Sequence, residues 1–429
     1  MSAADRLAQR LESELGRDAV KLDAQAAERY AVAGKAPRVV CFPSSAEQVA
    51  SILRLSSEAE AAVVPWGGGT AMRVGNPPRR CDLVLCLGCL DRVVEHDPAN
   101  LTVIVECGIT LRRLQESLAP HRQFFAVDPP RPGDTTIGGI VAANLNGPRR
   151  ASHGAVRDLV IGLKAALPSG ERIKAGGKVV KNVAGYDMCK LFTGSFGTLG
   201  VLTEATLRLA PAPESAATFL ASGSFDRVVA LAAELSGSFL LPAAVALLSP
   251  RALPVSPEVP TVAVWCEGFA AAVARHLRDL GSMAKRSALS SEVLEDEGHR
   301  RFWTAVGDFP LGNDGAVYRL TVPLSAVGTV VKTLTAPTGP AAPRVVAHAD
   351  SGTIWVAPDE KEPAASFDSL AGLALSHRGH AMLFSRPPGL PAGLDSWRAP
   401  PDNLALMREI KRQFDPAGLL NPGRFVAGI

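Results

Sequence analysis

The sequence predicts a mixed α+β protein with more than one domain. Short apolar runs typical of strands alternate along the chain with amphipathic stretches typical of helices. The 429 residues, 47% of them hydrophobic and 20% charged, are enough for two or three domains with sizeable cores. A proline-rich segment at 210–213 predicts a linker between a first and a second unit.

The predicted elements of the first unit follow one another closely. Ser44 and Glu47 have the spacing of a capping box, so we expect a helix that begins there and runs to about residue 55. Two strand-like runs flank the turn-forming residues 97–100 and are expected to pair. The other predicted helices are the leading amphipathic segment and 110–118, and the predicted strands are 61–64, 83–87, 92–96, 101–105, 160–166, 172–174 and 200–209.

The second unit has its own succession of alanine-rich helices and short strands. The acidic run 292–297 is predicted to be a solvated helix face. Further helices are predicted at 270–280 and 403–414, and strands at 261–266 and 317–322. The chain thus divides into an N-terminal helical segment at 1–35, a first domain at 36–213, a second domain at 214–386 and a C-terminal segment at 387–429.

Charge and hydropathy narrow the class of function. The formal net charge is only +3 and the basic residues are scattered, so no nucleic-acid surface is indicated, and Arg149 and Arg150 are predicted to lie in a solvated turn. The first residues carry charges and lack the apolar core of a signal peptide, and the run 239–248 is too short to cross a bilayer. We therefore expect a cytoplasmic protein without a transmembrane segment, peripheral to the inner membrane only through partner subunits.

Three glycine clusters carry the main functional signal. Residues 65–70, Pro-Trp-Gly-Gly-Gly-Thr, follow an apolar strand, and further clusters lie at 136–139 and 194–200. Successive glycines leave backbone N–H groups unshielded, so these groups can converge on an anion such as a pyrophosphate. None of the clusters has the spacing of a Rossmann motif or a P-loop. For any one cluster alone, a simple turn is the alternative.

Several cysteines and two histidines have spacings that a metal site could use. Cys81, Cys86 and Cys89 have the spacing of the first three ligands of a plant-type [2Fe–2S] site, with Cys107 available as a fourth. The alternative is a buried strand across 82–87, which would place neighbouring side chains on opposite faces. We favour the strand, and reduced thiols in a chain without a secretion signal. The pair His377 and His380 has no nearby carboxylate or thiol and is predicted to lie on the surface, so no metal site is expected.

Taken together, the motifs resemble the FAD-binding domain of the vanillyl-alcohol oxidase superfamily, also called the p-cresol methylhydroxylase (PCMH) type. Within that superfamily the chain is most similar to the FAD-binding subunits of bacterial glycolate oxidase. The resemblance covers residues 36–212 and the C-terminal residues 414–423. The motifs that carry it are 65–70, 128–139, 143–147, 153–158, 167–170, 178–204 and 414–423.

The resemblance implies a cofactor, an architecture and a set of contacts. It implies a PCMH-type FAD-binding domain of two α+β subdomains at 36–213, a smaller α+β cap domain at 214–386, and a C-terminal segment at 387–429 that returns to the FAD domain. Some relatives attach the flavin covalently through a histidine beside the first glycine loop, where this chain has Thr70. Non-covalent FAD is therefore expected, unless His153 or His96 serves instead. The implied FAD-binding residues are Trp66, Gly67, Gly68, Gly69, Thr70, Thr136, Ile137, Gly138, Gly139, Asn144, His153, Arg157, Gly194, Gly197, Thr198 and Val201.

The chemistry that the resemblance implies needs a cation for the substrate carboxylate and a base for its hydroxyl. Arg319, in a strand-like run, can form a bidentate pair with a carboxylate, and His348 has a suitable titration range. The alternatives are a solvated arginine and a core histidine. Catalytic relatives resemble His-x-Gly-Asp-Gly-Asn-x-His here, whereas this chain has Asp-Ser-Gly-Thr at 350–353 and Trp355 near the place of the second histidine.

We therefore expect the FAD-binding subunit of a glycolate oxidase (glycolate dehydrogenase)-type complex. Such a complex oxidises a small 2-hydroxy acid to the 2-oxo acid, and the resemblance implies a second flavoprotein subunit and an iron–sulfur subunit as partners. Two alternatives remain. In the first, the chain is a non-catalytic flavin-binding structural or electron-relay subunit. In the second, it is a free-standing FAD-dependent D-2-hydroxy acid dehydrogenase.

Overall fold

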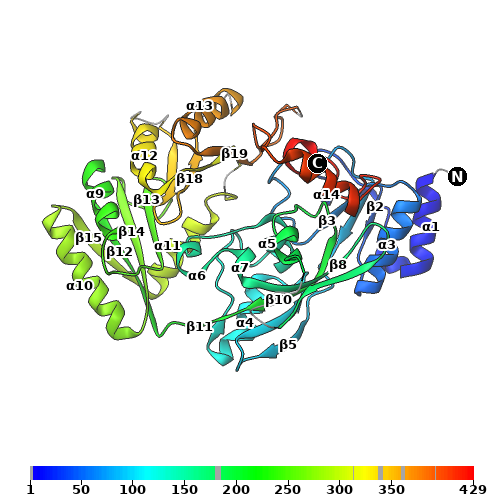
Figure 1. The fold of residues 1–429 in the computed structure, drawn as a ribbon, viewed down its shortest axis with the longest axis horizontal. Helices are drawn as coiled ribbons and strands as arrows, with labels where there is room; N and C mark the ends of the chain where they lie inside the picture. The colour runs from blue at the N-terminus through cyan, green and yellow to red at the C-terminus, as the bar shows by residue number, and fades with distance from the viewer. Residues whose placement is uncertain (1–2, 179–184, 313, 337–341, 359–362, 392) are drawn as a thin grey trace.

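The computed structural model describes residues 3–178, 185–312, 314–336, 342–358, 363–391 and 393–429. Over these residues the chain forms two packed halves (Figure 1). One half holds a four-stranded and a five-stranded sheet, and the other holds a single eight-stranded sheet. Residues 179–184, which belong to the longest motif of the predicted resemblance, lie outside the described residues.

The four-stranded sheet has the order β1-β2-β4-β3, and its last three strands are parallel. Their near-continuous apolar runs are typical of parallel strands buried on both faces. Leu11 and Ile52 bring two helices into the core beneath the sheet. The elements are β1 Val20–Lys21, β2 Val39–Cys41, β3 Val63–Trp66, β4 Leu83–Cys86, α1 Ala3–Leu15, α2 Ala24–Arg29, α3 Ala46–Glu58 and the short 3₁₀ helix η1 Arg17–Ala19.

The predicted capping box of α3 is displaced by one residue. Ser45, not Ser44, is the N-cap, and its hydroxyl accepts a hydrogen bond from the backbone N–H of Gln48. The side chain of Gln48 in turn accepts from the N–H of Ser44 at 2.7 Å. The prediction with Glu47 was wrong because two adjacent serines offer two caps, and here the second one has the extended backbone that a cap requires.

The five-stranded sheet is antiparallel throughout, with the order β5-β6-β10-β8-β9. The predicted pairing across residues 97–100 is confirmed by β5 and β6. The predicted linker at 210–213 is not free, because β11 Ala210–Pro211 pairs with β7 Gln123–Phe124. The other elements are β5 Val93–Asp97, β6 Thr102–Glu106, β8 Val160–Ala166, β9 Arg172–Gly176, β10 Val201–Arg208, α4 Leu111–Leu118, η2 Ala119–His121, α5 Ile137–Ala143, α6 Arg150–His153, α7 Val156–Leu159 and α8 Met188–Phe192.

The eight-stranded sheet is also antiparallel, with the order β15-β12-β14-β13-β17-β18-β16-β19. The acidic run predicted as a helix face begins instead as the edge strand β15, and its helix α11 starts only at Asp296. The strands are β12 Ser215–Ser222, β13 Ala244–Leu248, β14 Thr261–Gly268, β15 Ser290–Glu295, β16 Val317–Thr321, β17 Arg344–His348, β18 Thr353–Ala357 and β19 His380–Ser385.

The two faces of this sheet have different neighbours. Side chains alternate between faces along a strand, so Tyr318 and Leu320 enter the core under one set of helices while Arg319 and Thr321 point to the other side. The first face is covered by α9 Phe225–Ser236, α10 Ala270–Arg286, α12 Val327–Thr335, with the 3₁₀ turn η3 Leu324–Ala326 before it, and α13 Pro363–Ser376. The second face, with α11 Asp296–Asp308, is turned toward the other half of the molecule (Figure 1).

The C-terminal segment packs against the half that holds the two smaller sheets. After α14 Leu404–Phe414, Leu419 and Asn421 exchange backbone hydrogen bonds with Val63, and the chain ends in the 3₁₀ turn η4 Val426–Gly428. The buried ammonium of Lys411 donates to the carbonyls of Thr198 and Leu420 and to the Asp415 carboxylate at 2.6–2.9 Å. No helix among the described residues has the length and apolar character that crossing a membrane requires.

A buried ion-pair network joins the two halves. Arg149, predicted as a solvated residue, is only 8% exposed and binds the Asp128 carboxylate at 2.6 Å and the Glu267 carboxylate of β14 at 3.1 Å. His153 contacts the same Glu267 at 2.7 Å, and the guanidinium stacks over the Trp265 ring at 4.4 Å. Burial alone would lower the pKa of Arg149, but the two carboxylates outweigh it and raise that pKa. The prediction of a solvated turn was wrong for this residue, because its partners lie far away in the sequence.

Replacing Arg149 by Met should destabilise the protein by about 3 kcal/mol, because it leaves two buried carboxylates without their shared cation. Urea unfolding at pH 7.5 measures the change. The control is Arg275→Ala, which removes an exposed i,i+4 ion pair with Asp279 and should cost less than about 1 kcal/mol. Equal losses in the two variants would contradict the proposed importance of the buried network.

Candidate active site

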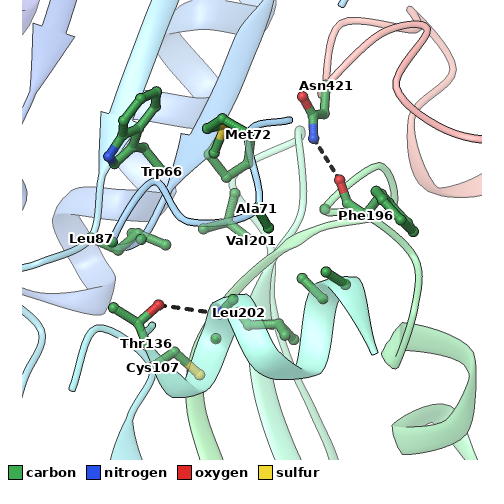
Figure 2. A pocket seen from close by; sticks show the side chains of 18 of the residues that line it. Trp66, Ala71, Met72, Leu87, Cys107, Thr136, Phe196, Val201, Leu202 and Asn421 are labelled. Carbon is green, nitrogen blue, oxygen red and sulfur yellow. Dashed lines mark hydrogen bonds between the residues drawn. The ribbon is translucent and has the colours of Figure 1, made fainter. Parts of the chain in front are cut away.

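The first glycine cluster forms one wall of a cavity. Residues 65–72 line it from the four-stranded sheet, and the segments 136–143 and 196–202 line it from the five-stranded sheet (Figure 2). Asn421 and Arg424 close it from the C-terminal segment. The cavity therefore lies where the two smaller sheets and the C-terminal segment meet.

The glycines of the first loop are required by close backbone contacts. A Cβ on Gly68 would lie 1.6 Å from the carbonyl oxygen of Asp134, and one on Gly67 would lie 2.2 Å from Oγ1 of Thr136. Gly69 has φ +76°, in the left-handed region that favours glycine. The loop is therefore pressed against residues 134–136, and two glycine clusters far apart in the sequence form one site.

The other walls are fixed by capping and by a cross-segment hydrogen bond. Thr136 is the N-cap of α5, and its hydroxyl accepts from the N–H of Gly139 at 3.2 Å. Asn421 donates from Nδ2 to the carbonyl of Phe196 at 2.5 Å, which ties the C-terminal segment to the third glycine cluster (Figure 2). The cavity is thus built from three loops that hold one another in place.

The structure brings many of the predicted FAD-binding residues to this cavity. Among the other predicted positions, Ile137 lies in the core, and Gly194 and Thr198 support the wall through hydrogen bonds of their own. Asn144 lines a second cavity instead. The predicted residues that line the glycine cavity are Trp66, Gly67, Gly68, Gly69, Thr70, Thr136, Gly138, Gly139, Gly197 and Val201.

The two histidines considered for a covalent flavin lie elsewhere. His153 is held by Glu267, and Nε2 of His96 lies 2.9 Å from the side-chain oxygen of Gln123. Neither histidine lines the glycine cavity, whereas Thr70 does. Arg157, predicted as an FAD contact, also lies outside the lining and is exposed beside Asp158, with 3.7 Å between the charged groups.

A second cavity, with a volume of about 260 Å³, adjoins the glycine cavity. Consecutive residues connect the two, because Ala143 lines the first and Asn144 lines the second. One wall of the second cavity is the loop and helix at 144–150, and the opposite half of the molecule contributes side chains from the eight-stranded sheet. Both predicted catalytic residues, Arg319 and His348, line this cavity.

Strand register explains why these side chains converge. Arg319 of β16 pairs with Trp355 of β18 and with Met382 of β19, and His348 of β17 pairs with Thr353. Residues directly opposite in an antiparallel pair point to the same face. Residues at 317–384 that are distant in the sequence therefore form one continuous wall.

The Arg319 guanidinium has no acidic partner among the residues that the structure describes. Its Nε is buried without a hydrogen-bond partner among the described residues, and its Nη2 contacts only the sulfur of Met382 at 3.5 Å. The ring of Phe384 lies 5.6 Å from the guanidinium carbon. Burial, with a smaller contribution from the charge of Arg150, lowers the pKa of Arg319 to about 10. Arg319 is therefore a partly desolvated cation at neutral pH that lacks an anion.

His348 is neutral at neutral pH. It is 5% exposed, its Nδ1 is buried without a partner in the described part of the chain, and burial lowers its pKa to about 4. A neutral imidazole can accept a proton. Two residues later, burial raises the pKa of Asp350 to about 7, even though the N–H of Val245 donates to this carboxyl at 3.0 Å.

Two lining residues were missed by the sequence analysis. Arg150 and His380 are exposed, as predicted, but both also line the second cavity. His380 could have been found from strand alternation with Met382 and Phe384, which face the same side. Arg150 carried no such signal, because its position depends on the long-range pairing of its neighbour Arg149.

The cysteine spacing produces no cluster. Cys86 lies in β4, Cys81 and Cys107 are also buried, and Cys89 is exposed. In the described part of the chain no three His, Cys, Asp or Glu side chains gather as metal ligands. Cys107 instead lines the glycine cavity, where its Cβ would lie 2.9 Å from a Cβ on Gly138.

Comparisons with known proteins identify the class. Residues 37–176 match the FAD binding domain, and residues 397–425 match the C-terminal domain of FAD linked oxidases. A solved p-cresol methylhydroxylase with substrate bound has a TM-score of 0.75 at 15% identity, over 98% of this chain and 96% of that chain. That likeness shows the fold alone. The chain thus has a PCMH-type fold and carries an FAD-binding domain, as the resemblance predicted.

Two curated relatives carry the comparison further. Glycolate oxidase subunit GlcD of Bacillus subtilis is 35% identical over 213 residues, which are 49% of this chain and 45% of GlcD. The chain thus spans about half the length of this relative. Glycolate oxidase subunit GlcE of Escherichia coli is 29% identical over 344 residues, which are 79% of this chain and 86% of GlcE. FAD is the cofactor that these matches support.

Gly68→Ala should abolish FAD binding, because the added Cβ cannot fit beside the Asp134 carbonyl and the loop must move. The flavin absorbance per purified chain measures the loss, and circular dichroism reports whether the chain still folds. Gly88→Ala is the control, since a Cβ there meets nothing within 4 Å and the variant should keep its full flavin content. A flavin-replete Gly68→Ala protein would show that the loop does not hold the cofactor.

Asp350→Asn should change how stability depends on pH. The folded-state pKa of Asp350 is raised from 3.8 to about 7, so the folded chain keeps a proton that the unfolded chain releases. The stability that this proton gives to the folded state is fully present below pH 4 and is lost as the pH rises through 7. The variant should therefore gain stability relative to wild type between pH 4 and 7, by about 4 kcal/mol at the plateau.

Urea unfolding of both proteins from pH 4.5 to 8 measures this difference in stability. His348 has the opposite pH dependence, but it is present in both proteins, so its contribution cancels in the difference. Asp279→Asn, on the exposed side of α10, serves as the matched control and should give a constant difference. A constant difference for Asp350→Asn as well would disprove the burial argument.

Proposed function

We propose that the chain holds FAD in the glycine cavity and oxidises a small 2-hydroxy acid to the 2-oxo acid in the adjoining cavity. It would act as the FAD-binding subunit of a glycolate oxidase-type complex. The reduced flavin would pass its electrons to a second flavoprotein subunit and an iron–sulfur subunit. The residues proposed to hold FAD are those of the predicted set that line the glycine cavity. In this proposal residues 36–213 bind the cofactor, 214–386 form the cap, and 387–429 complete the cofactor site.

One observation carries the substrate assignment. Arg319 is a half-buried cation, and no carboxylate lines its cavity among the described residues. A desolvated guanidinium is costly unless an anion pairs with it, and a carboxylate is the anion whose geometry suits a bidentate pair. The site is therefore suited to an acid substrate placed beside the cofactor cavity.

In this proposal, different residues of the second cavity bind the substrate, accept its proton and exclude water. Arg319 binds and orients the carboxylate, which fixes the direction of the α-carbon. The neutral imidazole of His348 accepts the hydroxyl proton as the C–H bond breaks and the C=O bond forms. FAD, when bound, accepts the hydride with its electron pair. Trp355 and Phe384, on the same face, exclude water from the reacting atoms.

A specific observation favours a second candidate function. Residues 350–353 keep only the second glycine of the Gly-Asp-Gly-Asn motif of catalytic relatives, and Asp350 does not line the cavity. The similarity to GlcE extends over most of both chains. A flavin-binding relay subunit that never contacts the acid would fit these two facts.

Anaerobic mixing of the purified, FAD-loaded chain with glycolate or D-lactate separates the two functions. If the chain is a dehydrogenase, the flavin absorbance bleaches without any partner subunit. If the chain is a relay subunit, the flavin stays oxidised with either acid and is reduced only when the partner subunits are added. A purified chain that binds no FAD would contradict both functions.

Arg319→Ala should raise the concentration of acid needed for half-maximal flavin reduction by about 100-fold, because it removes a charge-assisted bidentate contact. Arg319→Lys should recover part of the loss, since it restores the charge without the planar fork. Rapid-mixing spectroscopy measures both, with flavin content as the check on folding. An unchanged half-saturation in Arg319→Ala would place the acid elsewhere.

A further inference from the structure

The cavity beside the proposed cofactor site is lined by a second guanidinium, that of Arg150, which has no ion pair with the described residues. It lies on a different element from Arg319, since Arg150 begins α6 whereas Arg319 lies in β16. The two charges are close enough for Arg150 to affect the ionisation of Arg319. From this pair we infer that the natural substrate is a 2-hydroxy dicarboxylic acid rather than a monocarboxylic acid such as glycolate, with Arg319 and Arg150 each binding one carboxylate. The inference rests on the proposed function and specifies its substrate.

The position of Arg150 is set by the structure around it. Its neighbour Arg149 is locked between Asp128 and Glu267, which fixes the start of α6. One turn further along, the hydroxyl of Ser152 donates to the carbonyl of Ala243 beside β13 at 2.9 Å. The short helix α6 therefore sits firmly between the two halves (Figure 1), although the Arg150 side chain itself makes no ion pair with any described residue.

The charge of the cavity suits a dianion. Arg319 and Arg150 line it together with His348 and His380, and its described lining contains no Asp or Glu. Arg319 is half-buried and Arg150 is exposed, and two guanidinium groups in one cavity repel each other. A monocarboxylate leaves one positive charge uncompensated, whereas a dicarboxylate neutralises both and forms a charge-assisted contact on each wall.

The size of the cavity agrees with this assignment. Its volume of about 260 Å³ is larger than a two-carbon acid fills, and the two guanidinium groups line it from different walls. A four- or five-carbon chain with a carboxylate at each end can reach both. The hydroxyl groups of Thr321 and Thr353 line the same cavity and can contact the intervening atoms.

The test compares substrates and variants in the FAD-loaded chain. Anaerobic flavin reduction is measured with glycolate and D-lactate, and with D-malate and D-2-hydroxyglutarate. We expect a second-order rate constant at least about tenfold higher for a dicarboxylic acid, since one charge-assisted contact has roughly that value. Arg150→Ala should lower the dicarboxylate rate constant at least about tenfold more than the monocarboxylate rate constant. Arg275→Ala, on the outer face, should change neither.

A binding measurement keeps this inference separate from the proposed function. The affinities of pyruvate and 2-oxoglutarate for the oxidised protein are measured from the shift in flavin absorbance. Tighter binding of 2-oxoglutarate, lost in Arg150→Ala, would support the dicarboxylate site even in a chain that reduces its flavin with no acid. If the monocarboxylic acids react and bind as well as the dicarboxylic acids, or if Arg150→Ala weakens both classes equally, the inference fails while the proposed function stands.

Discussion

The buried pairing of Arg149 with Asp128 and Glu267 is the constraint on which the candidate active site depends. Asp128 and Arg149 belong to the half with the smaller sheets, and Glu267 belongs to β14 of the large sheet. The second cavity has one wall from each half, so its shape exists only while the halves keep this relation. Breaking a buried ion pair costs far more than breaking an exposed one, and this makes the relation rigid. The functional cavity is thus a consequence of an interface rather than of one domain.

The shape of the glycine cavity depends on close contacts between backbone segments, just as the second cavity depends on the buried ion pairs. The loop at 67–69 touches residues 134–136 so tightly that no side chain fits between them, and the C-terminal Asn421 closes the remaining side through Phe196. Loops anchored on three sides need no rearrangement to present their N–H groups. The same anchoring makes the cofactor cavity depend on the last residues of the chain, more than 200 positions from the third glycine cluster.

Much of the fold could be predicted from local sequence signals. The strands at 160–166 and 201–208 and the β5–β6 hairpin follow from hydrophobic periodicity and turn residues, and the fold class follows from the motifs. Of the candidate site, Arg319 and His348 were named and do lie in one cavity, although their roles remain proposals. Arg150 and the buried state of Arg149 could not be predicted, because both depend on Glu267, 118 positions further along the chain. Local patterns carry no information about such partners.

The departure at 350–353 and the charge of the second cavity have different consequences for function. The first glycine, the aspartate and the asparagine of the motif are replaced at 350, 351 and 353, and Trp355 stands near the place of the second histidine, so His348 is the proposed proton acceptor. A site that bound no acid would not need Arg319 or Arg150. The partly desolvated Arg319, which has no anionic partner among the described residues, would then only lower the stability of the fold. A site that retains Arg319 and Arg150 together, with no acid in its described lining, is better explained by an anionic ligand. The charge of the second cavity therefore supports the proposal that the chain binds an acid there, although its sequence departs from that of catalytic relatives at 350–353.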